Sequence, residues 1–552
     1  MIHYQKTILM KKLKHTYIMV ICLLCLACNQ EFLDKNPNDA LSADSFWSNE
    51  YDAIAGLTAI YDALETGNES LGWATLGLFD LFTPLGNSRN GVYRQIAEGV
   101  HNPDNRIVNE LWENMYKGVV RSNDFLVHID EIPFEGENGE ERKNIMIGEA
   151  RFLRAMYYYL LVEVYGDVPL FITVPTAQDA DAYRAPVSEV VELMKEDLLF
   201  AVDHLPVPGQ EQTGRATKGA ALALRMKIGL FEKDWAAAAT AAEQIMSMGY
   251  SLVPNYEDVI STTNENNEEV IFDVEHIFRN ESESGGNFEK MYAFRSASAD
   301  GWSWMQPTSW YVDQFERIIQ NPVEGVDYIN EDPDRIPDDV YAYFEGRDPR
   351  LDHTILRPGS HFKDKLDDDI LYPHDFQAVN HSQVGMHMRK YVIPGAETSQ
   401  SRDSPLDYII FRYADVLLNY LEAVAMRDGG AETVSQAILD QTINSIRSRA
   451  SEDLPLYTAG AITMADIYRE RMVELSMEGW SFFDMRRNSM IEINEGFGVY
   501  GLTVDAGNTV DFNPNIINQV RIFDPAMHYL WPIPTSELER GKNLTQNPGY
   551  PE

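Results

Sequence analysis

The stretch GEARFLRAMYYYLLVEVYGDVPL, residues 148–170, decides the fold of this chain. Its apolar side chains recur at three- and four-residue steps, which is the period of an α-helix. They also cover the opposite side of that helix, and a helix that is apolar nearly all round is a buried one. Gly166 and Pro169 predict its end, because glycine adopts the left-handed conformation freely and proline cannot continue a helix. Arg151 and Arg154 lie in this apolar context, so we expect them to meet buried acidic partners.

A second stretch, YRERMVELSMEGWSFFDMRRN at residues 468–488, is the expected partner of the first. As one continuous helix it would bring Glu470, Glu474 and Glu478 to one face. Like charges at that spacing repel unless cations lie across them, so the sequence predicts a buried, paired network of charges. The candidate cations are Arg154, Arg471, Arg486 and Arg487.

Composition limits what the folded chain can bind. The chain has 552 residues, of which 44% are hydrophobic, and this favours a large globular core over disorder. Its formal net charge of −41 argues against nucleic acid, because phosphate binding needs a surplus of lysine and arginine. All 3 cysteines, Cys22, Cys25 and Cys28, lie near the N-terminus, so no disulfide framework is expected in the body.

The N-terminus resembles a bacterial lipoprotein signal. An apolar run at residues 18–27 follows a lysine-rich start and is too short to span a bilayer, so residues 1–27 are predicted to be a signal peptide. Ala27 followed by Cys28 resembles a lipobox, which implies that Cys28 is acylated and that residues 28–41 form a lipidated tether. The alternative is a plain secretory peptide with incidental cysteines.

The body of the chain predicts a mostly α fold. Helical periodicity recurs at residues 42–64, 108–129 and 187–205. Small residues favour close helical hairpins at residues 216–248 and 407–450, which resemble tetratricopeptide repeats.

The middle of the chain is different. Residues 251–404 are irregular, and short strands are expected at residues 269–273 and 388–393. We therefore expect one globular unit over residues 42–552, in which tetratricopeptide-like helical hairpins carry a large irregular, loop-rich face and a few short strands. Its N-terminal part would end near residue 250 and its C-terminal part would follow.

Catalytic and metal-binding motifs are weak in this sequence. It has no HExxH or GxSxG motif, and no cysteine of the body could act as a nucleophile. Glu474 and Glu478 could suggest a glycosidase pair, but beside arginines they would stay ionised, whereas a general acid needs a raised pKa. Residues 364–369, DKLDDD, lack the spacing and glycine of an EF-hand, so a solvated acidic loop is the better interpretation. The sequence predicts a protein that is not an enzyme, with no metal site and no cofactor.

Aromatic residues in two irregular regions are the best candidates for a binding site. Residues 67–105 and 292–311 are rich in aromatic and small polar side chains, and they would have to converge in the fold. A flat aromatic ring can cover the apolar face of a sugar while polar neighbours take its hydroxyls. The alternative is that these aromatic residues pack the core. The candidate ligand-binding residues are Trp73, Asn87, Arg89, Tyr93, Arg94, Arg295, Trp302, Trp304 and Trp310.

Several segments resemble, in order, the motifs of one known family. The two stretches quoted above, RYADVLLNYLEA at residues 412–423 and WPIPTSELERGKNLTQNPGY at residues 531–550 are similar to the SusD/RagB family of Bacteroidetes outer-membrane lipoproteins. The likeness runs from Cys28 to Tyr550.

This resemblance implies a SusD-like fold and a function. The chain would be a nutrient-binding lipoprotein, anchored in the outer membrane through Cys28 and facing the cell surface. It would capture oligo- or polysaccharide and deliver it to a partner TonB-dependent, SusC-like transporter. Binding of peptides or another nutrient by the same fold, as in RagB-like relatives, is one alternative, and a helical-repeat scaffold that binds nothing is another.

Overall fold

The computed structural model describes most of the chain that follows the predicted tether. The described residues are 46–65, 70–277, 286, 288–294, 301–318, 340–364, 366–373, 375, 382–395, 404–505, 507 and 509–551. The predicted signal peptide, the tether with Cys28, and Arg295 lie outside them, so the boundaries at residues 27 and 41 stay predictions.

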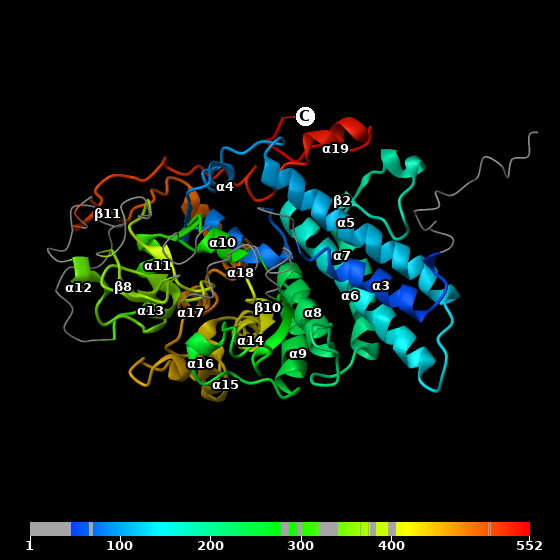
Figure 1. Ribbon diagram of the computed structural model, residues 1–552, viewed down its shortest axis with the longest axis horizontal. Coiled ribbons are helices and arrows are strands. Elements are labelled where there is room, and N and C mark those ends of the chain that lie inside the picture. The colour runs from blue at the N-terminus through cyan, green and yellow to red at the C-terminus, as the bar shows by residue number, and fades with distance from the viewer. Residues whose placement is uncertain are drawn as a thin grey trace, which may run out of the picture.

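A group of long helices forms the N-terminal part of the molecule (Figure 1). Its helices are α3 (Glu50–Tyr61), η2 (Trp73–Phe82), α4 (Gly91–Ala97), α5 (Arg106–His128), η3 (Ile129–Glu131), α6 (Gly139–Tyr165), η4 (Ala177–Asp181), α7 (Val187–His204), α8 (Lys218–Glu232) and α9 (Trp235–Met246). Asn49 begins α3, because its side chain accepts from the backbone amide of Tyr51 at 2.9 Å. Contacts place α6 against both α5 and α7, and α8 against α9 as the predicted hairpin.

Helix α6 confirms the prediction drawn from residues 148–170. Every residue from Phe152 to Tyr165 is buried, and Gly166 follows with a φ of 73°. Arg154 is buried with them and lies 2.7 Å from Asp197 of α7, measured from Nη2 to Oδ1. The buried arginine therefore has the acidic partner that its surroundings required.

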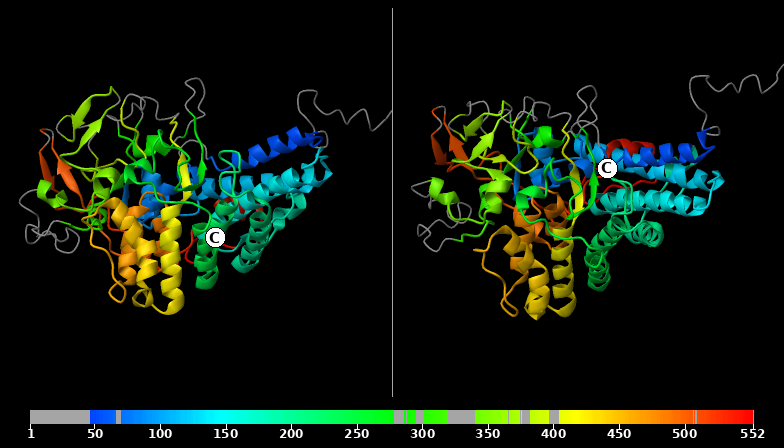
Figure 2. Two further views of the ribbon diagram at one scale, coloured as in Figure 1. Left: turned by 90° about the horizontal axis from the view of Figure 1, so that it is seen from below. Right: turned by 60° about the horizontal axis from the view of Figure 1, so that its bottom comes forward.

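The C-terminal part adds a second helical group beside α9. Its elements are β10 (Tyr408–Arg412), α14 (Tyr413–Asp428), η8 (Ala431–Thr433), α15 (Gln436–Gln441), α16 (Ile443–Ala450), α17 (Met464–Glu474), α18 (Trp480–Arg487), η9 (Met490–Asn494) and α19 (Thr535–Arg540). Helix α14 contacts α9, so helices of the two parts lie side by side (Figure 2). The hairpin predicted over residues 407–450 is corrected at its start: Tyr408–Arg412 is a fully buried strand, because its aromatic and β-branched residues suit a sheet.

The strands are short and pair in twos. β10 pairs antiparallel with β4 (Val270–Val274), which confirms the strand predicted near residues 269–273. The strand predicted at residues 388–393 shrinks to β9 (His387–Met388), which pairs with β6 (Ile355–Leu356). The other pairs are β1 (Gly86–Ser88) with β5 (Met305–Pro307), β2 (Val168–Pro169) with β3 (Arg184–Ala185), β7 (His361–Lys363) with β8 (Asp369–Leu371), and β11 (Leu502–Val504) with β12 (Val510–Phe512). Between them lie η5 (Tyr256–Asp258), α10 (Phe288–Tyr292), α11 (Ser309–Val312), α12 (Val340–Phe344) and α13 (Arg350–Thr354).

The helix predicted over residues 468–488 is broken in the middle. Helix α17 ends at Glu474, α18 begins at Trp480, and Met477 and Gly479 between them have φ values of 61° and 90°. Only glycine fits at position 479, because a Cβ there would lie 2.1 Å from the backbone oxygen of Leu76. The three glutamates therefore do not share one helical face.

The same glutamates nevertheless form the buried, paired network that was expected. Arg412 lies 2.7 Å from Glu474 through Nη1 and 2.8 Å from Glu478 through Nη2. Arg350 Nη1 lies 2.6 Å from Glu470 Oε1. These arginines come from β10 and α13, far from the glutamates in the chain, so helical spacing could not reveal them.

The cations named from the sequence have other partners. Arg471 Nε donates to Asp484 Oδ2 at 2.8 Å, and Arg487 Nη2 lies 2.9 Å from Asp484 Oδ1. Arg486 Nη1 donates to the carbonyl of Glu163 at 2.6 Å. The prediction of a network is confirmed and the choice of these cations is wrong, because tertiary contacts decide which charges meet.

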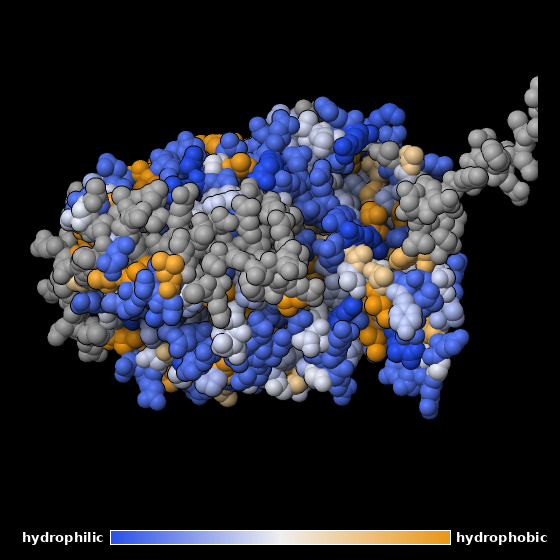
Figure 3. All heavy atoms as spheres, in the orientation of Figure 1, coloured by the Kyte–Doolittle hydropathy of each residue, from blue (hydrophilic) through white to orange (hydrophobic). Residues whose placement is uncertain are grey.

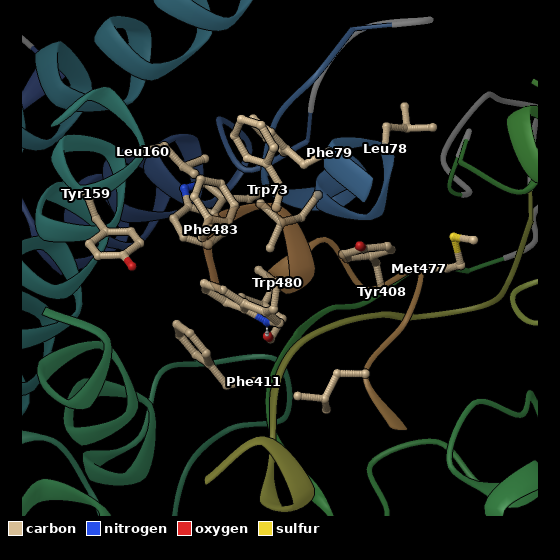
Figure 4. Packing of buried hydrophobic residues seen from close by; sticks show 14 of the residues in the cluster. Trp73, Leu78, Phe79, Tyr159, Leu160, Tyr408, Phe411, Met477, Trp480 and Phe483 are labelled. Carbon is tan, nitrogen blue, oxygen red and sulfur yellow. Dashed lines mark hydrogen bonds between the residues drawn. The ribbon is translucent and has the colours of Figure 1, made fainter. Parts of the chain in front are cut away.

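The two parts share one core around Trp480 (Figure 4). The ring of Trp480 stacks on Phe411 of β10 with centroids 5.6 Å apart, and its Nε1 donates to the carbonyl of Ile410 at 2.9 Å. Trp73 of η2 lies 6.4 Å from Trp480, again between ring centroids. A rigid scaffold therefore lies beneath the irregular face.

Candidate functional site

Strands β1 and β5 bring together the two aromatic regions that were expected to converge. They pair antiparallel, with Asn87 opposite Gln306. The backbone amide of Arg89 also donates to the carbonyl of Trp304 at 3.3 Å, which extends the ribbon. Because side chains alternate along a strand, these four residues lie on the same face of the ribbon.

Trp302 and Trp304, called the tryptophan pair below, are the main aromatic feature of this face. Both rings are half-buried, and their centroids lie 4.5 Å apart at an interplanar angle of 31°. Their backbone amides donate to the carbonyls of Lys290 (2.9 Å) and Met291 (2.7 Å) in α10. Ser303 between them has a φ of 49°, and the Lys290 Nζ lies 3.5 Å from the centroid of Trp302. The pair is therefore fixed before any ligand arrives.

Two aromatic residues that were predicted to bind ligand lie in the core instead. Trp73 and Tyr93 are both 0% exposed. Every residue of η2 is buried, which places Trp73 against Phe411 and Trp480. Tyr93 of α4 packs against the tryptophan pair, with its centroid 5.8 Å from that of Trp304. Neither ring is open to a ligand, and the role of Tyr93 is to support Trp304.

The polar candidates differ in exposure. Arg89 is exposed, and its side chain has no hydrogen-bond or ionic partner among the described residues. Arg94 is half-buried, with its Nε 3.7 Å from the carboxylate of Glu98. Asn87 is only 2% exposed and bonds to neighbouring amides. Of these, Arg89 is the most exposed, and Asn87 bonds to its neighbours beneath the surface.

The structure adds two residues that the sequence analysis missed. Gln383 and Asn518 are exposed, and their side chains bond to that of Asn87 at 3.3 and 3.0 Å. They are single amides 296 and 431 residues away from Asn87 in the chain, so no sequence pattern marks them. Trp310 of α11 is half-buried against Phe497, and within the described part of the chain it makes no ring contact with the tryptophan pair.

The carboxylates considered for glycosidase chemistry are ionised. Burial alone would raise the pKa of Glu478, but the charges of Arg412 and Lys390 outweigh it and lower the pKa. Burial would also raise the pKa of Glu474, but the charges of Arg449, Arg412 and Arg350 outweigh this effect and hold that pKa well below its usual range. Within the described residues, no three His, Cys, Asp or Glu side chains gather in a way that could hold a metal ion. None of the described helices is long and apolar enough to cross a membrane.

Comparison with known proteins gives the family. A family described as "SusD family" matches residues 268–550, and a second one, "Starch-binding associating with outer membrane", matches residues 31–230. The chain belongs to the SusD family. SusD proteins bind glycans and do not catalyse reactions, which agrees with the absence of catalytic motifs from the sequence. The second description associates such proteins with the outer membrane.

Individual proteins support this assignment along the whole chain. "SusD-like protein P2" of Formosa agariphila is 25% identical and aligns with 98% of this chain and 100% of its own length. The crystal structure of a SusD-like protein from Bacteroides fragilis is 26% identical, with a TM-score of 0.77 over 94% of this chain and 100% of that one. A SusD-like carbohydrate-binding protein of the same species is 27% identical, with a TM-score of 0.75 over 91% and 100%. The predicted SusD-like, mostly α fold is confirmed.

Proposed function

We propose that this SusD protein is a cell-surface lipoprotein that captures oligo- or polysaccharide and delivers it to a partner TonB-dependent, SusC-like transporter. The observation that carries the proposal is the tryptophan pair, half-buried and fixed beside the exposed Arg89, whose backbone amide donates to the carbonyl of Trp304. The carbohydrate-binding name of the similar protein from Bacteroides fragilis supports it.

The chemistry of the pair suits a sugar. A pyranose ring has an apolar C–H face that gains from contact with an indole, while hydroxyls at its edge keep their hydrogen bonds. The guanidinium of Arg89 offers five N–H donors to such hydroxyls and can move to meet them, because it has no partner among the described side chains.

Anchoring and delivery rest on the sequence. Cys28 after the apolar run supports acylation, and two or more acyl chains anchor stably where one binds only marginally. The transporter is inferred from the SusD family, in which the lipoprotein is expected to lie over the barrel as a lid.

A binding screen tests the proposal. The purified full chain, in mild detergent, is run in native gels that contain individual polysaccharides and is titrated with oligosaccharides and peptides by calorimetry. We expect a glycan to be bound, and Trp304→Ala to weaken binding by about 1–3 kcal/mol at an unchanged melting temperature. Binding of peptides alone would favour the nutrient alternative, and no binding at all would favour the scaffold. Normal glycan binding by Trp302→Ala and Trp304→Ala would move the site elsewhere on the irregular face.

A further inference from the structure

Four side-chain amides form one hydrogen-bonded group beside the tryptophan pair. Asn87 and Gln306, which face each other across β1 and β5, are buried at 2% and 0% exposure. Gln383 and Asn518 join them from two distant segments and are exposed at the surface. We call these four residues the amide cluster.

The hydrogen bonds fix which way each amide points. Asn87 Nδ2 donates to Gln306 Oε1 at 3.4 Å and to Gln383 Oε1 at 3.3 Å. Asn87 Oδ1 accepts from Asn518 Nδ2 at 3.0 Å. The backbone amide of Gln383 also donates to Gln306 Oε1, at 3.1 Å. The oxygen of Gln383 and the nitrogen of Asn518 are therefore turned inward.

The opposite atoms are left for a ligand. A side-chain amide has one acceptor oxygen and one NH₂ donor. When the oxygen points inward the donor faces outward, and when the nitrogen points inward the acceptor faces outward. Among the described residues, neither the Nε2 of Gln383 nor the Oδ1 of Asn518 has a hydrogen-bond partner. Two exposed side chains thus present one donor and one acceptor next to the same buried Asn87.

The amide cluster also holds the backbone of the tryptophan pair. Gln306 Nε2 donates to the carbonyl of Ser303 at 3.0 Å, and Ser303 is the residue with positive φ between Trp302 and Trp304. Ser303 Oγ is in turn 2.9 Å from His387 Nδ1. Because Gln306 bonds both to this turn and to Asn87, the aromatic rings and the outward amide atoms are fixed relative to each other.

We propose that Gln383 and Asn518 are specificity-determining residues that read neighbouring hydroxyls of an uncharged sugar residue held at the tryptophan pair. A hydroxyl both donates and accepts, so one can accept from Gln383 Nε2 while its neighbour donates to Asn518 Oδ1. This inference rests on the proposed function, since it presumes that the tryptophan pair binds glycan.

The charges favour an uncharged sugar. Gln383 and Asn518 are neutral amides, so Arg89 and Lys290 are the described cations beside the tryptophan pair that could attract a carboxylate or a sulfate. The chain has a formal net charge of −41, whose field repels an approaching polyanion. The selected class is therefore neutral glycan, with binding that depends little on salt.

Two substitutions remove the outward atoms. Gln383→Glu keeps an oxygen for Asn87 Nδ2 and replaces the outward donor by an acceptor. Asn518→Gly removes the outward acceptor together with the inward Nδ2 that donates to Asn87 Oδ1, and it adds no backbone strain, because Asn518 has a φ of 65° and glycine adopts this conformation freely. Gln210→Glu, at an exposed turn, controls for the added charge, and Asn266→Gly, exposed with a φ of 51°, controls for loss of an asparagine in the same conformation.

The experiment is calorimetric titration of the full chain with gluco-, manno-, xylo- and galacto-oligosaccharides and with polygalacturonate. For the neutral oligosaccharide that the wild type binds most tightly, each of the two variants should lose about three- to tenfold in affinity, the effect of one neutral hydrogen bond. Both controls should bind as wild type, all melting temperatures should agree, and raising NaCl from about 50 to 500 mM should change the affinity less than twofold. If Gln383→Glu does not fold, Gln383→Met removes the same donor without a charge.

The possible outcomes distinguish a failure of this inference from a failure of the proposed function. If Trp304→Ala weakens binding while Gln383→Glu and Asn518→Gly bind like their controls, the role assigned to Gln383 and Asn518 is overturned and the proposed function stands. Tighter binding of polygalacturonate than of every neutral oligosaccharide, weakened by salt, would overturn the neutral class. A wild-type chain that binds no glycan would refute the proposed function and the inference together.

Discussion

Replacing Glu474 with glutamine should destabilise the whole fold, because it removes one charge from the buried network. Glu474 is 0% exposed and lies 2.7 Å from Arg412 and 2.9 Å from Arg350, with Arg449 as a third partner. Removing one partner of a buried ion pair costs about 3–5 kcal/mol. Glutamine keeps the shape and one acceptor oxygen but turns an NH₂ group toward a guanidinium, so we expect a loss of about 3 kcal/mol.

The composition of the network sharpens this expectation. Its acids are Asp348, Glu269, Glu316, Glu470, Glu474 and Glu478, and its cations are Arg350, Arg412, Arg447, Arg449 and Lys390. Glu316 is partly exposed, and the side chains of the remaining acids and of the cations are all buried and equal in number, so the substitution leaves one cation in excess within the buried group. No solvent can reach it without opening the core, since both Arg350 and Arg412 are 1% exposed.

Thermal unfolding followed by circular dichroism measures the effect. An unfolding entropy of about 2.1 cal/mol/K per residue gives about 1 kcal/mol/K for a chain of this size, so the melting temperature should fall by about 3 °C. Glu452→Gln is the matched control: Glu452 is exposed and has no partner among the described residues, and its substitution should stay within about 0.5 kcal/mol of wild type. A Glu474→Gln variant that melts with this control at pH 7 would refute the reasoning.

The same variant should show a characteristic dependence on pH. The folded-state pKa of Glu474 lies well below its ordinary value: burial acts to raise it, and the charges of Arg449, Arg412 and Arg350 overcome that effect. A carboxylate with a depressed pKa stabilises the fold above its unfolded pKa of about 4.3, and this contribution is lost as the pH falls toward the folded value. The difference between wild type and variant should thus be constant from about pH 8 to 5 and shrink below about pH 4.3. A difference in stability between wild type and variant that grows on acidification would contradict this expectation.

Four further predictions follow from the site and the sequence. Cys28→Ser should release the protein from membranes or stall its processing, and a variant that fractionates and matures like wild type would disprove the lipid anchor. Trp73→Ala should lower the melting temperature by about 3–5 °C through loss of about 3–5 kcal/mol of core packing, whereas Trp304→Ala should lower glycan affinity at constant melting temperature. The purified protein should bind oligosaccharide without cleaving it, and steady product release that is lost in Glu478→Gln would revive a glycosidase. Mild-detergent extraction of native membranes should co-purify a TonB-dependent barrel, over an interface of about 1,600 Å² or more, and recovery of the lipoprotein alone would count against the partner.

The parts of the fold that could be predicted depend on local rules. The period of residues 148–170 and the glycine that ends α6 act within a few residues, so the sequence displays them. The break between α17 and α18 was missed because Met477, a residue that seldom takes positive φ, adopts it beside Gly479. The close approach of Leu76 fixes that turn, and Leu76 lies far away in the chain.

The candidate binding site also combines features that local sequence predicts with features that only distant contacts decide. Trp73 and Trp302 both occur in irregular sequence, and only the fold distinguishes them: η2 carries Trp73 into the core, while the turn at Ser303 leaves Trp302 at the surface. The register of β1 and β5 then places Asn87 where two isolated amides can reach it. Residue types indicated the region of the candidate site, but pairing between segments far apart in the chain decides which residues lie in it.

The distribution of charge links the core to the binding face. Acids and cations nearly cancel within the buried network, so almost all of the formal charge of −41 resides outside it, and the coloured part of the face in Figure 3 is largely hydrophilic. An acidic exterior opposes polyanions at long range, whereas stacking on the tryptophan pair and bonding to neutral amides need no ionic attraction. The same exterior is repelled by anionic lipid headgroups, which favours a body held away from the bilayer. The proposed neutral ligand and the predicted tether at residues 28–41 are thus both compatible with one placement of charge.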